Sequence, residues 1–413
     1  MIDEKTTDLI IERLTNRVDE ANTLFLKEMG ALIKQIKQLT PSEAHKLVQM
    51  LKYGGNYDKI VKQISKYTDL NVKEIDKIFA EYAKKDLNFN QKFYRYRNIP
   101  FTPYERNKAI KMQTEALSRI VKNEVYNFSR ANVLGYTITD DQGNLIFKGL
   151  RETYNDLLDT ALMNVSQGKE TFDSSMSRIM QSVGESGLKT LDFESGRSIR
   201  LDSAVRMHLK GRLRELQNEN QKIMGEQFDY DGWEISVHEN PAPDHEDAQG
   251  RQFSIKEYNK LQSDGVATDT TGKEINMHLE LKNGERALSF RPISEYNCYH
   301  VARSIVLGVS KPRYSEEDLQ KIIDRNNKGF DFDGKHYNTM YEGTQMQRRI
   351  ETEIRRQKDL QIFAKAGDNQ ELIAKSQAKI TKLLHKYQKL NDVSGLRPKL
   401  DRLKVVGYRK VKI

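Results

Sequence analysis

Apolar residues spaced three and four positions apart constrain this chain more than any other feature of its sequence. Between residues 7 and 39 they form a single stripe along one long helix, made of Leu9, Ile10, Leu14, Val18, Ala21, Leu24, Phe25, Met29, Leu32, Ile33 and Ile36. Thr40-Pro41-Ser42-Glu43 then supplies an N-cap, a proline at the first helical position and a capping-box glutamate, so a second helix is predicted, which Gly54-Gly55 would end. Short amphipathic helices are expected from there to about Lys85. Because each stripe needs a partner, we interpret this region as a helical bundle.

The composition favours elongated helices over a sphere. Of the 413 residues, 37% are hydrophobic and 31% are charged, and the mean hydropathy of -0.75 suits helices with a narrow apolar stripe. This length has room for two or three domains. The net charge of +9 favours a polyanionic partner, either nucleic acid or an acidic protein surface. The alternative is that the mixed charges only solvate the helices.

The sequence also bounds the compartment. The single cysteine excludes an intrachain disulfide, and no apolar run approaches the roughly 18 to 20 residues that cross a bilayer. The chain opens directly into a charged helical pattern without the apolar segment of a signal peptide. We therefore expect a protein that is made in a cytoplasm and at first stays there.

Basic and aromatic side chains are interleaved in residues 91–106, where the cations are Lys92, Arg95, Arg97 and Arg106. Such a run can stack on bases and clasp phosphates. Its two prolines instead favour an extended connector between helices, with the rings packed down and the cations in solvent. Further along we expect a helical block over 108–135, a hairpin that turns at 141–144, helices over 150–165, 170–183 and 201–225, and a Gly- and Ser-rich hinge over 184–196.

The only Trp and the only Cys lie within residues 233–300, which read as strands and tight loops rather than long helices. The alternation of Trp233-Glu234-Ile235-Ser236-Val237-His238 predicts a strand. A short helix over 255–261, a polar loop over 262–275 and a short helix over 298–306 are expected to follow. We interpret this region as the compact core of the molecule.

Four side chains of this core are a plausible ligand set for one structural zinc ion, which takes imidazole nitrogen and thiolate sulfur in tetrahedral array: His238, His245, Cys298 and His300. A Cys-x-His pair on a strand would point both side chains to one face. The alternative is that the histidines only hydrogen-bond the loops together. Residues 244–247 also crowd carboxylates against an imidazole, as a general base requires. Because no phosphate loop, dinucleotide fingerprint, nucleophile elbow or metalloprotease helix accompanies them, we predict no catalytic residue and no firm cofactor.

The last third of the chain has a simple pattern. Ser315 opens a helix in capping fashion, and residues 344–366 and 369–390 predict two long helices that form a hairpin or coiled-coil arm. From Leu396 onward the chain has a charge of +6, because Asp401 is the only acid against seven basic residues: Arg397, Lys399, Arg402, Lys404, Arg409, Lys410 and Lys412. This tail is either disordered and solvated or a contact surface for nucleic acid or another polyanion.

A set of short motifs carries a family resemblance from about residue 195 to 395. In order they are Ala204-Val205-Arg206-Met207, His238, Pro243-x-His245, Gln249-Gly250, Phe253, Asn297-Cys298-x-His300, Gly308-Val309-Ser310-Lys311-Pro312 and Tyr341-Glu342-x-Thr344-Gln345-x-Gln347-Arg348. Together they resemble the phage minor capsid protein 2 family and, more distantly, the Mu F-like head morphogenesis domain. The N-terminal bundle has no motif of either family. The chain departs from the family pattern at Ala242, Ala248 and Tyr299, where Arg, Trp and Arg are usual. These departures favour a packing role over a metal-binding or catalytic one.

The resemblance implies a minor head protein of a tailed bacteriophage or prophage, present in few copies near the portal and involved in head assembly or DNA delivery. Its partners would be portal and capsid proteins and the packaged DNA, with no small-molecule substrate and no membrane segment, and it would be assembled into the virion in the bacterial cytoplasm. The rivals are a virion-associated metal-dependent hydrolase or nuclease and a DNA-binding accessory factor. We predict a mainly helical α+β fold divided into 1–90, 91–195, 196–320, 321–395 and the tail 396–413.

Overall fold

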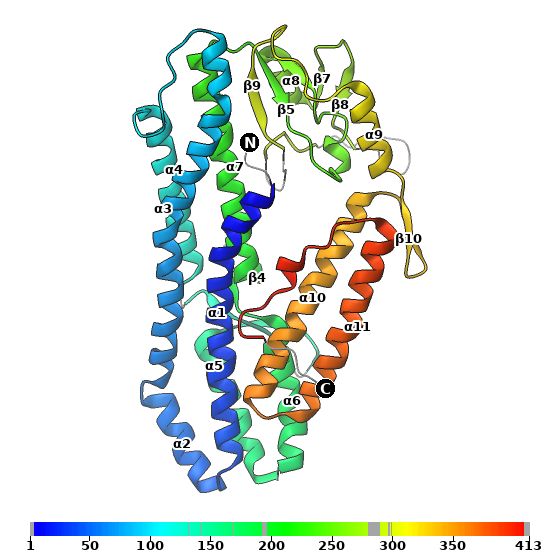
Figure 1. Ribbon diagram of the computed structural model, residues 1–413. Helices are drawn as coiled ribbons and strands as arrows, with labels where there is room; N and C mark the ends of the chain where they lie inside the picture. Colours follow the sequence, from blue (N-terminus) through cyan, green and yellow to red (C-terminus); the bar gives the residue numbers. More distant parts are fainter. Residues whose placement is uncertain are drawn as a thin grey trace.

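The structure, a computed structural model, is predominantly α-helical with small antiparallel sheets, which confirms the predicted α+β class. It describes residues 4–130, 132–140, 142–167, 169–191, 196–279, 290–295, 298 and 300–408. The molecule is elongated, with a long helical bundle, a small lobe of strands at one end and a helical hairpin against one side (Figure 1). Within the described residues no helix is both long and apolar enough to cross a membrane.

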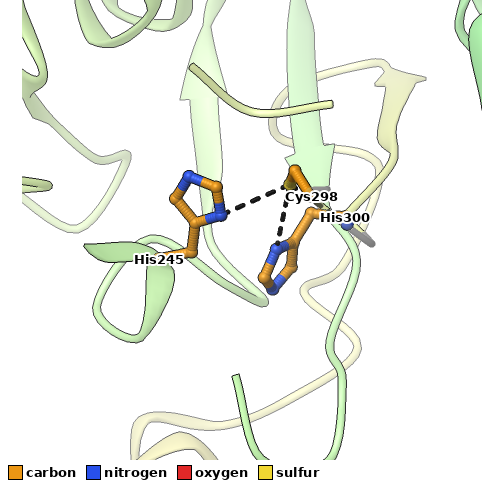
Figure 2. A group of neighbouring side chains, drawn as sticks. All are labelled: His245, Cys298 and His300. Carbon is orange, nitrogen blue, oxygen red and sulfur yellow. Dashed lines mark hydrogen bonds between the residues drawn. The ribbon is translucent and has the colours of Figure 1, made fainter. Parts of the chain in front are cut away.

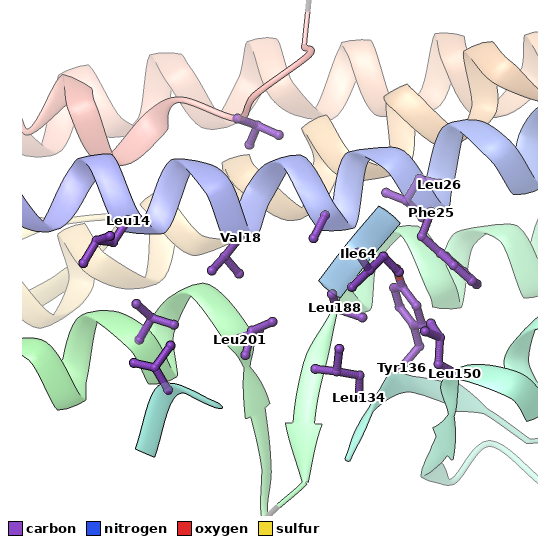
Figure 3. Packing of buried hydrophobic residues seen from close by; sticks show 14 of the residues in the cluster. Leu14, Val18, Phe25, Leu26, Ile64, Leu134, Tyr136, Leu150, Leu188 and Leu201 are labelled. Carbon is purple, nitrogen blue, oxygen red and sulfur yellow. The ribbon is translucent and has the colours of Figure 1, made fainter. Parts of the chain in front are cut away.

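Four long helices form the bundle: α1 (Glu4–Lys37), α3 (Asn56–Tyr96), α4 (Lys108–Phe128) and α7 (Leu201–Gln227). The end away from the strand lobe is built by α2 (Pro41–Tyr53), α5 (Leu150–Asn164), η1 (Val165–Gln167) and α6 (Lys169–Ser186) (Figure 1). From Leu14 to Ile36 the predicted stripe of α1 is the buried or half-buried face, whereas the side chains of Leu9 and Ile10 lie outside the described part. Leu14, Val18 and Phe25 point toward side chains of α7 and of a small sheet (Figure 3). Each fully buried Leu or Phe contributes about 1.5–3 kcal/mol, so this stripe is a main source of stability.

Local signals at the start of α2 act as predicted. The Thr40 side chain accepts a hydrogen bond from the Glu43 backbone N–H, and the Glu43 carboxylate accepts one from the Thr40 N–H, with Pro41 in the first turn. This reciprocal pair satisfies two donors that a helix N-terminus otherwise leaves open.

The prediction of several short helices before residue 85 was wrong, because α3 is one helix of 41 residues. No Gly or Pro interrupts Asn56–Tyr96, so nothing stops the helix until Asn98, which has a positive φ, and Pro100. The predicted extended connector over 91–106 is therefore helical in its first six residues. Tyr94 explains this extension, because its ring is buried against Phe101 and Phe228.

A four-stranded antiparallel sheet crosses α1. Its order is β2-β1-β3-β4, with β1 (Leu134–Thr139), β2 (Leu145–Gly149), β3 (Lys189–Leu191) and β4 (Ser198–Arg200). The predicted β1–β2 hairpin is confirmed, and the Asp140 carboxylate accepts from the backbone N–H groups of Gln142 and Asn144 in its turn. The expected hinge over 184–196 instead contains β3, whose backbone pairs with β1 and β4. Positions 192–195 lie outside the described residues.

The strand lobe contains the central motifs. Its main sheet has the order β6-β5-β9, formed by β5 (Gly232–Ile235), β6 (Gln252–Ser254) and β9 (Ala302–Ile305), all antiparallel. Also here are η2 (Pro243–His245), α8 (Ile255–Asp264) and the hairpin of β7 (Val266–Thr268) and β8 (Glu274–Asn276). The strand at Trp233 and the helix after 255 are confirmed. The polar loop over 262–275 contains β7 and most of β8. Within the predicted helix over 298–306, residues 302–305 form a strand instead, because their backbone pairs with β5.

The C-terminal part begins with α9 (Glu316–Asn326) and the hairpin of β10 (Phe330–Phe332) and β11 (Lys335–Tyr337). The predicted helical hairpin follows as α10 (Met340–Ala366) and α11 (Gln370–Ser394), and η3 (Leu400–Leu403) lies in the tail. This hairpin is docked on the bundle rather than free, because α10 contacts both α1 and α6. The contact is close at Gly30, where an added Cβ would lie 2.5 Å from Ala366 Cβ.

Candidate metal centre and cationic surfaces

Three of the four predicted ligands meet in the strand lobe. His245 is the last residue of η2, whereas Cys298 and His300 precede β9. The Cys298 Sγ lies 3.3 Å from His245 Nδ1 and 3.5 Å from His300 Nδ1 (Figure 2). The three side chains are only 1%, 2% and 2% exposed. Two loops that are remote in sequence therefore share one interior, as the sequence predicts.

The second nitrogen of each imidazole has a defined partner. His245 Nε2 lies 2.6 Å from the Arg291 carbonyl, which can only accept, so this nitrogen is the donor. His300 Nε2 lies 3.4 Å from Gln249 Oε1, and the same oxygen accepts the His238 backbone N–H at 3.1 Å. That backbone donor fixes the orientation of the Gln249 amide. Both rings therefore turn Nδ1 toward the sulfur, and in a neutral imidazole this atom is a lone pair. Burial lowers the pKa of His245, but the hydrogen bond to Cys298 and the charge of its thiolate raise it overall, and the protonated ring donates Nδ1–H to the sulfur.

The sulfur also accepts backbone hydrogen bonds. The N–H groups of Ser294 and His300 lie 3.3 and 3.4 Å from Cys298 Sγ. Burial raises the pKa of the thiol, but the hydrogen bond to His245 and these two N–H groups lower it, and the pKa ends below its usual value. Burial, aided by the neighbouring histidines, lowers the pKa of His300 well below its ordinary range. His300 is thus a neutral imidazole.

His238 does not join the cluster of three donor atoms found among the described residues. Its ring stands edge-on to His300, with 4.6 Å between ring centroids. The expectation of a Cys-x-His pair on a strand was wrong, because Cys298 and His300 lie in irregular backbone before β9 begins. The alternation of a strand is therefore not what brings Cys298 and His300 to one sulfur-centred cluster.

Two of the three carboxylates of residues 244–247, those of Asp244 and Glu246, have structural partners. Asp244 binds the Arg291 guanidinium through two hydrogen bonds of 2.6 Å, and Glu246 accepts from Asn326 and Asn327 at 2.7 and 3.1 Å. These bonds tie the η2 loop to the segment before Cys298 and to α9. Gln249 was noted in the sequence only as part of a motif. No pattern in the sequence distinguished Arg291 or Ser294 from other polar residues.

A family comparison covers nearly all of this architecture. The family model of phage minor capsid protein 2 matches residues 2–392. The chain belongs to the phage minor capsid protein 2 family. Searches of curated proteins and of solved structures returned no match. The match confirms the resemblance predicted from the central motifs and extends it, because the N-terminal bundle of this minor capsid protein also belongs to the family.

The basic tail of the minor capsid protein is ordered where the structure describes it. Leu396, Leu403 and Val405 are buried, and the Thr23 hydroxyl donates to the Val406 carbonyl at 2.7 Å. Residues 396–408 therefore pack on α10 and α1, in contrast to the disordered alternative.

The cations of the tail differ in whether they lie near a carboxylate. Arg402 lies 3.9 Å from Glu351, and Lys404 lies 3.2 Å from Glu12. The backbone of Lys399 donates to the Tyr387 hydroxyl, and Arg397 is exposed. The remaining predicted contacts, Arg409, Lys410 and Lys412, lie outside the described residues.

A second group of cations gathers where α3 meets the strand lobe. The four cations are Lys92, Arg303, Lys311 and Arg313, and they line a cavity of about 390 Å³ together with Phe93 and Tyr96. Among the described residues that line this cavity, Glu234 is the only acid. We call these residues the cationic groove. Lys92, Arg303 and Arg313 also lie 5.0, 5.6 and 4.9 Å from the centre of the Phe89 ring. Burial and the nearby Arg313 lower the pKa of Arg303 to about 10, so positive charge is concentrated here.

Proposed function

We propose that this minor capsid protein is a structural component of the phage head, placed near the portal, where it helps head assembly or DNA delivery. The observation that carries the proposal is the family match over residues 2–392, which includes the bundle, the strand lobe and the helical hairpin. An elongated frame whose long helices pack against one another is consistent with such a structural part.

Mass spectrometry of purified phage heads tests this role. We expect peptides of the chain in DNA-filled heads, in fewer copies than the major capsid protein, and cross-links from the chain to the portal. Heads made by a phage lacking the gene should be defective. The proposal is overturned when the chain is abundant in the infected cell but absent from purified heads.

A contact with packaged DNA is the second candidate function, and the cationic groove supports it. Phosphodiesters bind clustered Lys and Arg, and aromatic rings beside them offer stacking surface. In the groove four cations face one carboxylate, that of Glu234. The described tail cations Arg402 and Lys404 instead lie close to the carboxylates of Glu351 and Glu12. The groove is therefore a better DNA contact than this part of the tail.

Duplex DNA binding across a salt series tests the groove. We expect Lys92→Glu with Lys311→Glu to weaken binding and to flatten the dependence on salt by about two released counterions. The control, Lys46→Glu with Lys62→Glu, makes the same charge change on exposed positions at the opposite end of the bundle. Equal losses in the two variants would show that only net charge matters, and would remove the groove as a site.

A further inference from the structure

We propose that His245 Nδ1, Cys298 Sγ and His300 Nδ1 bind one zinc ion that fastens the η2 loop to the segment before β9. A zinc ion at this cluster does not depend on the capsid role, so a negative zinc measurement would leave that role intact, and absence of the chain from phage heads would leave the zinc site intact.

The two separations between the sulfur and the imidazole nitrogens match those of a tetrahedral zinc site. Zinc takes sulfur at about 2.3 Å and imidazole nitrogen at about 2.0–2.1 Å, so tetrahedral angles place nitrogen and sulfur donors about 3.5 Å apart. The two observed Sγ to Nδ1 distances are 3.3 and 3.5 Å. All three donor atoms lie within 4.8 Å of one another. The side chains are therefore preorganised around one point.

Proton counting favours a metal over hydrogen bonds alone. When both rings are neutral, each Nδ1 is an acceptor, because each Nε2 donates to an oxygen. Cys298 has one S–H proton, which can satisfy only one of the two rings, while the sulfur already accepts two backbone N–H groups. Three buried lone pairs thus converge with at most one proton among them. A divalent cation satisfies all three at once.

The surroundings have the second-shell contacts expected of a metal site. Metal-binding histidines almost always donate their other N–H to a carbonyl or carboxylate, which fixes the ring. Here the Arg291 carbonyl holds His245 and the Gln249 amide oxygen holds His300. Ser294, which donates to the sulfur, also lines a cavity of about 870 Å³ between α7 and α10.

The same surroundings favour a structural role for the zinc. Three protein ligands leave a fourth position to water, as in catalytic zinc sites, so the structural role depends on the lack of a general base at that water. Asp244 is instead held by two hydrogen bonds from Arg291, and Glu246 by Asn326 and Asn327. Thiolate and imidazole donors select zinc over the hard cations calcium and magnesium.

Elemental analysis of the purified full-length protein is the first test. We expect one zinc ion per chain in the wild type, loss of it in Cys298→Ser and His245→Ala, and retention in His238→Ala. The last variant is the matched control, because it removes the imidazole beside His300 that is not a ligand. Gln249→Leu should weaken zinc binding about 10- to 100-fold in a chelator competition, as loss of a second-shell partner does.

A second measurement uses Co²⁺ in place of zinc in the wild-type protein, so it does not depend on whether a variant folds. Wild-type protein loaded with Co²⁺ should show a sulfur-to-cobalt charge-transfer band, whose intensity reports thiolate ligation directly. The proposal is overturned by wild-type protein that contains no zinc after purification from zinc-supplemented cells and shows no such band with Co²⁺. It is equally overturned when His238→Ala loses zinc as completely as Cys298→Ser, since the ligand set would then be different.

Discussion

Replacing Asp19 by Asn should stabilise the protein at neutral pH. Asp19 is buried on α1 beside a cluster that joins α7 to α10, in which Arg200 binds Asp202 and Asp359 at 3.1 and 3.0 Å and Arg355 also binds Asp202. Three carboxylates thus share two guanidinium groups. Burial, followed by the charge of Asp202, raises the pKa of Asp19 from 3.8 to about 8, despite the opposing effect of Arg355.

The sign and size of the effect follow from linkage. Between pH 4 and 8 Asp19 keeps its proton in the folded protein but loses it in the unfolded chain. The folded state is therefore not penalised by this group below about pH 4, and the penalty grows as the pH rises to about 8. At pH 7 the interval from 3.8 is about three pKa units, and each unit is worth about 1.4 kcal/mol. Asn at position 19 does not titrate, so unfolding of the Asp19→Asn variant releases no proton at this position. The substitution should raise the free energy of unfolding at pH 7 by up to about 4 kcal/mol.

Urea unfolding at pH 4, 5.5, 7 and 8 measures the effect. The difference between Asp19→Asn and wild type should be smallest at pH 4 and grow steadily with pH. Glu28→Gln, an exposed change on the same helix, is the control and should give a small difference at every pH. A difference between Asp19→Asn and wild type that is the same at pH 4 and pH 8 would refute the assignment of a raised pKa to Asp19.

Three further substitutions test packing and capping. Gly30→Ala gains about 1 kcal/mol of helix propensity, but its Cβ would lie 2.5 Å from Ala366 Cβ, so we expect a net loss of about 1–3 kcal/mol in chemical unfolding. The matched change Gly211→Ala, in α7 with no atom within 4 Å of the new Cβ, should stabilise by about 1 kcal/mol, and a loss there would contradict the packing argument. Thr40→Ala removes the capping box of α2 and should cost about 1 kcal/mol, whereas no loss would show that Pro41 alone sets the helix start.

The elements that the sequence predicted well are those set by local signals. The stripe of α1, the capping box at Thr40 and the α10–α11 hairpin each follow from residues within a few turns of one another. β9 was predicted as a helix because its identity depends on β5, about 70 residues earlier in the chain, whose backbone it pairs with. Periodicity within a short apolar run does not contain that information.

The candidate metal centre was predicted only as far as residue type allows. His245, Cys298 and His300 were identified because imidazole and thiolate are zinc ligands, but sequence spacing could not separate them from His238. The distinction depends on how the Pro-x-Pro loop turns, which sets His245 beside the sulfur and leaves His238 edge-on to His300. Arg291 was missed because its role comes from the carbonyl it presents to His245, and every residue has a carbonyl.

The distribution of charge gives the broader reason why composition alone misplaces a binding surface. The tail was predicted as a polyanion contact from a local excess of six positive charges, yet folding brings Lys404 to Glu12 and Arg402 to Glu351, carboxylates far away in sequence. The cationic groove arises by the opposite route, because Lys92 and Arg303 are separated by more than 200 residues and no run of basic residues joins them. In the groove Arg313 pairs with Glu234 at 3.1 Å and Arg303 is buried, but Lys92 and Lys311 are exposed, so positive charge remains there after folding. An anionic partner is attracted by charge that remains after internal pairing, so the groove outranks the described tail although the tail has the higher charge density in sequence.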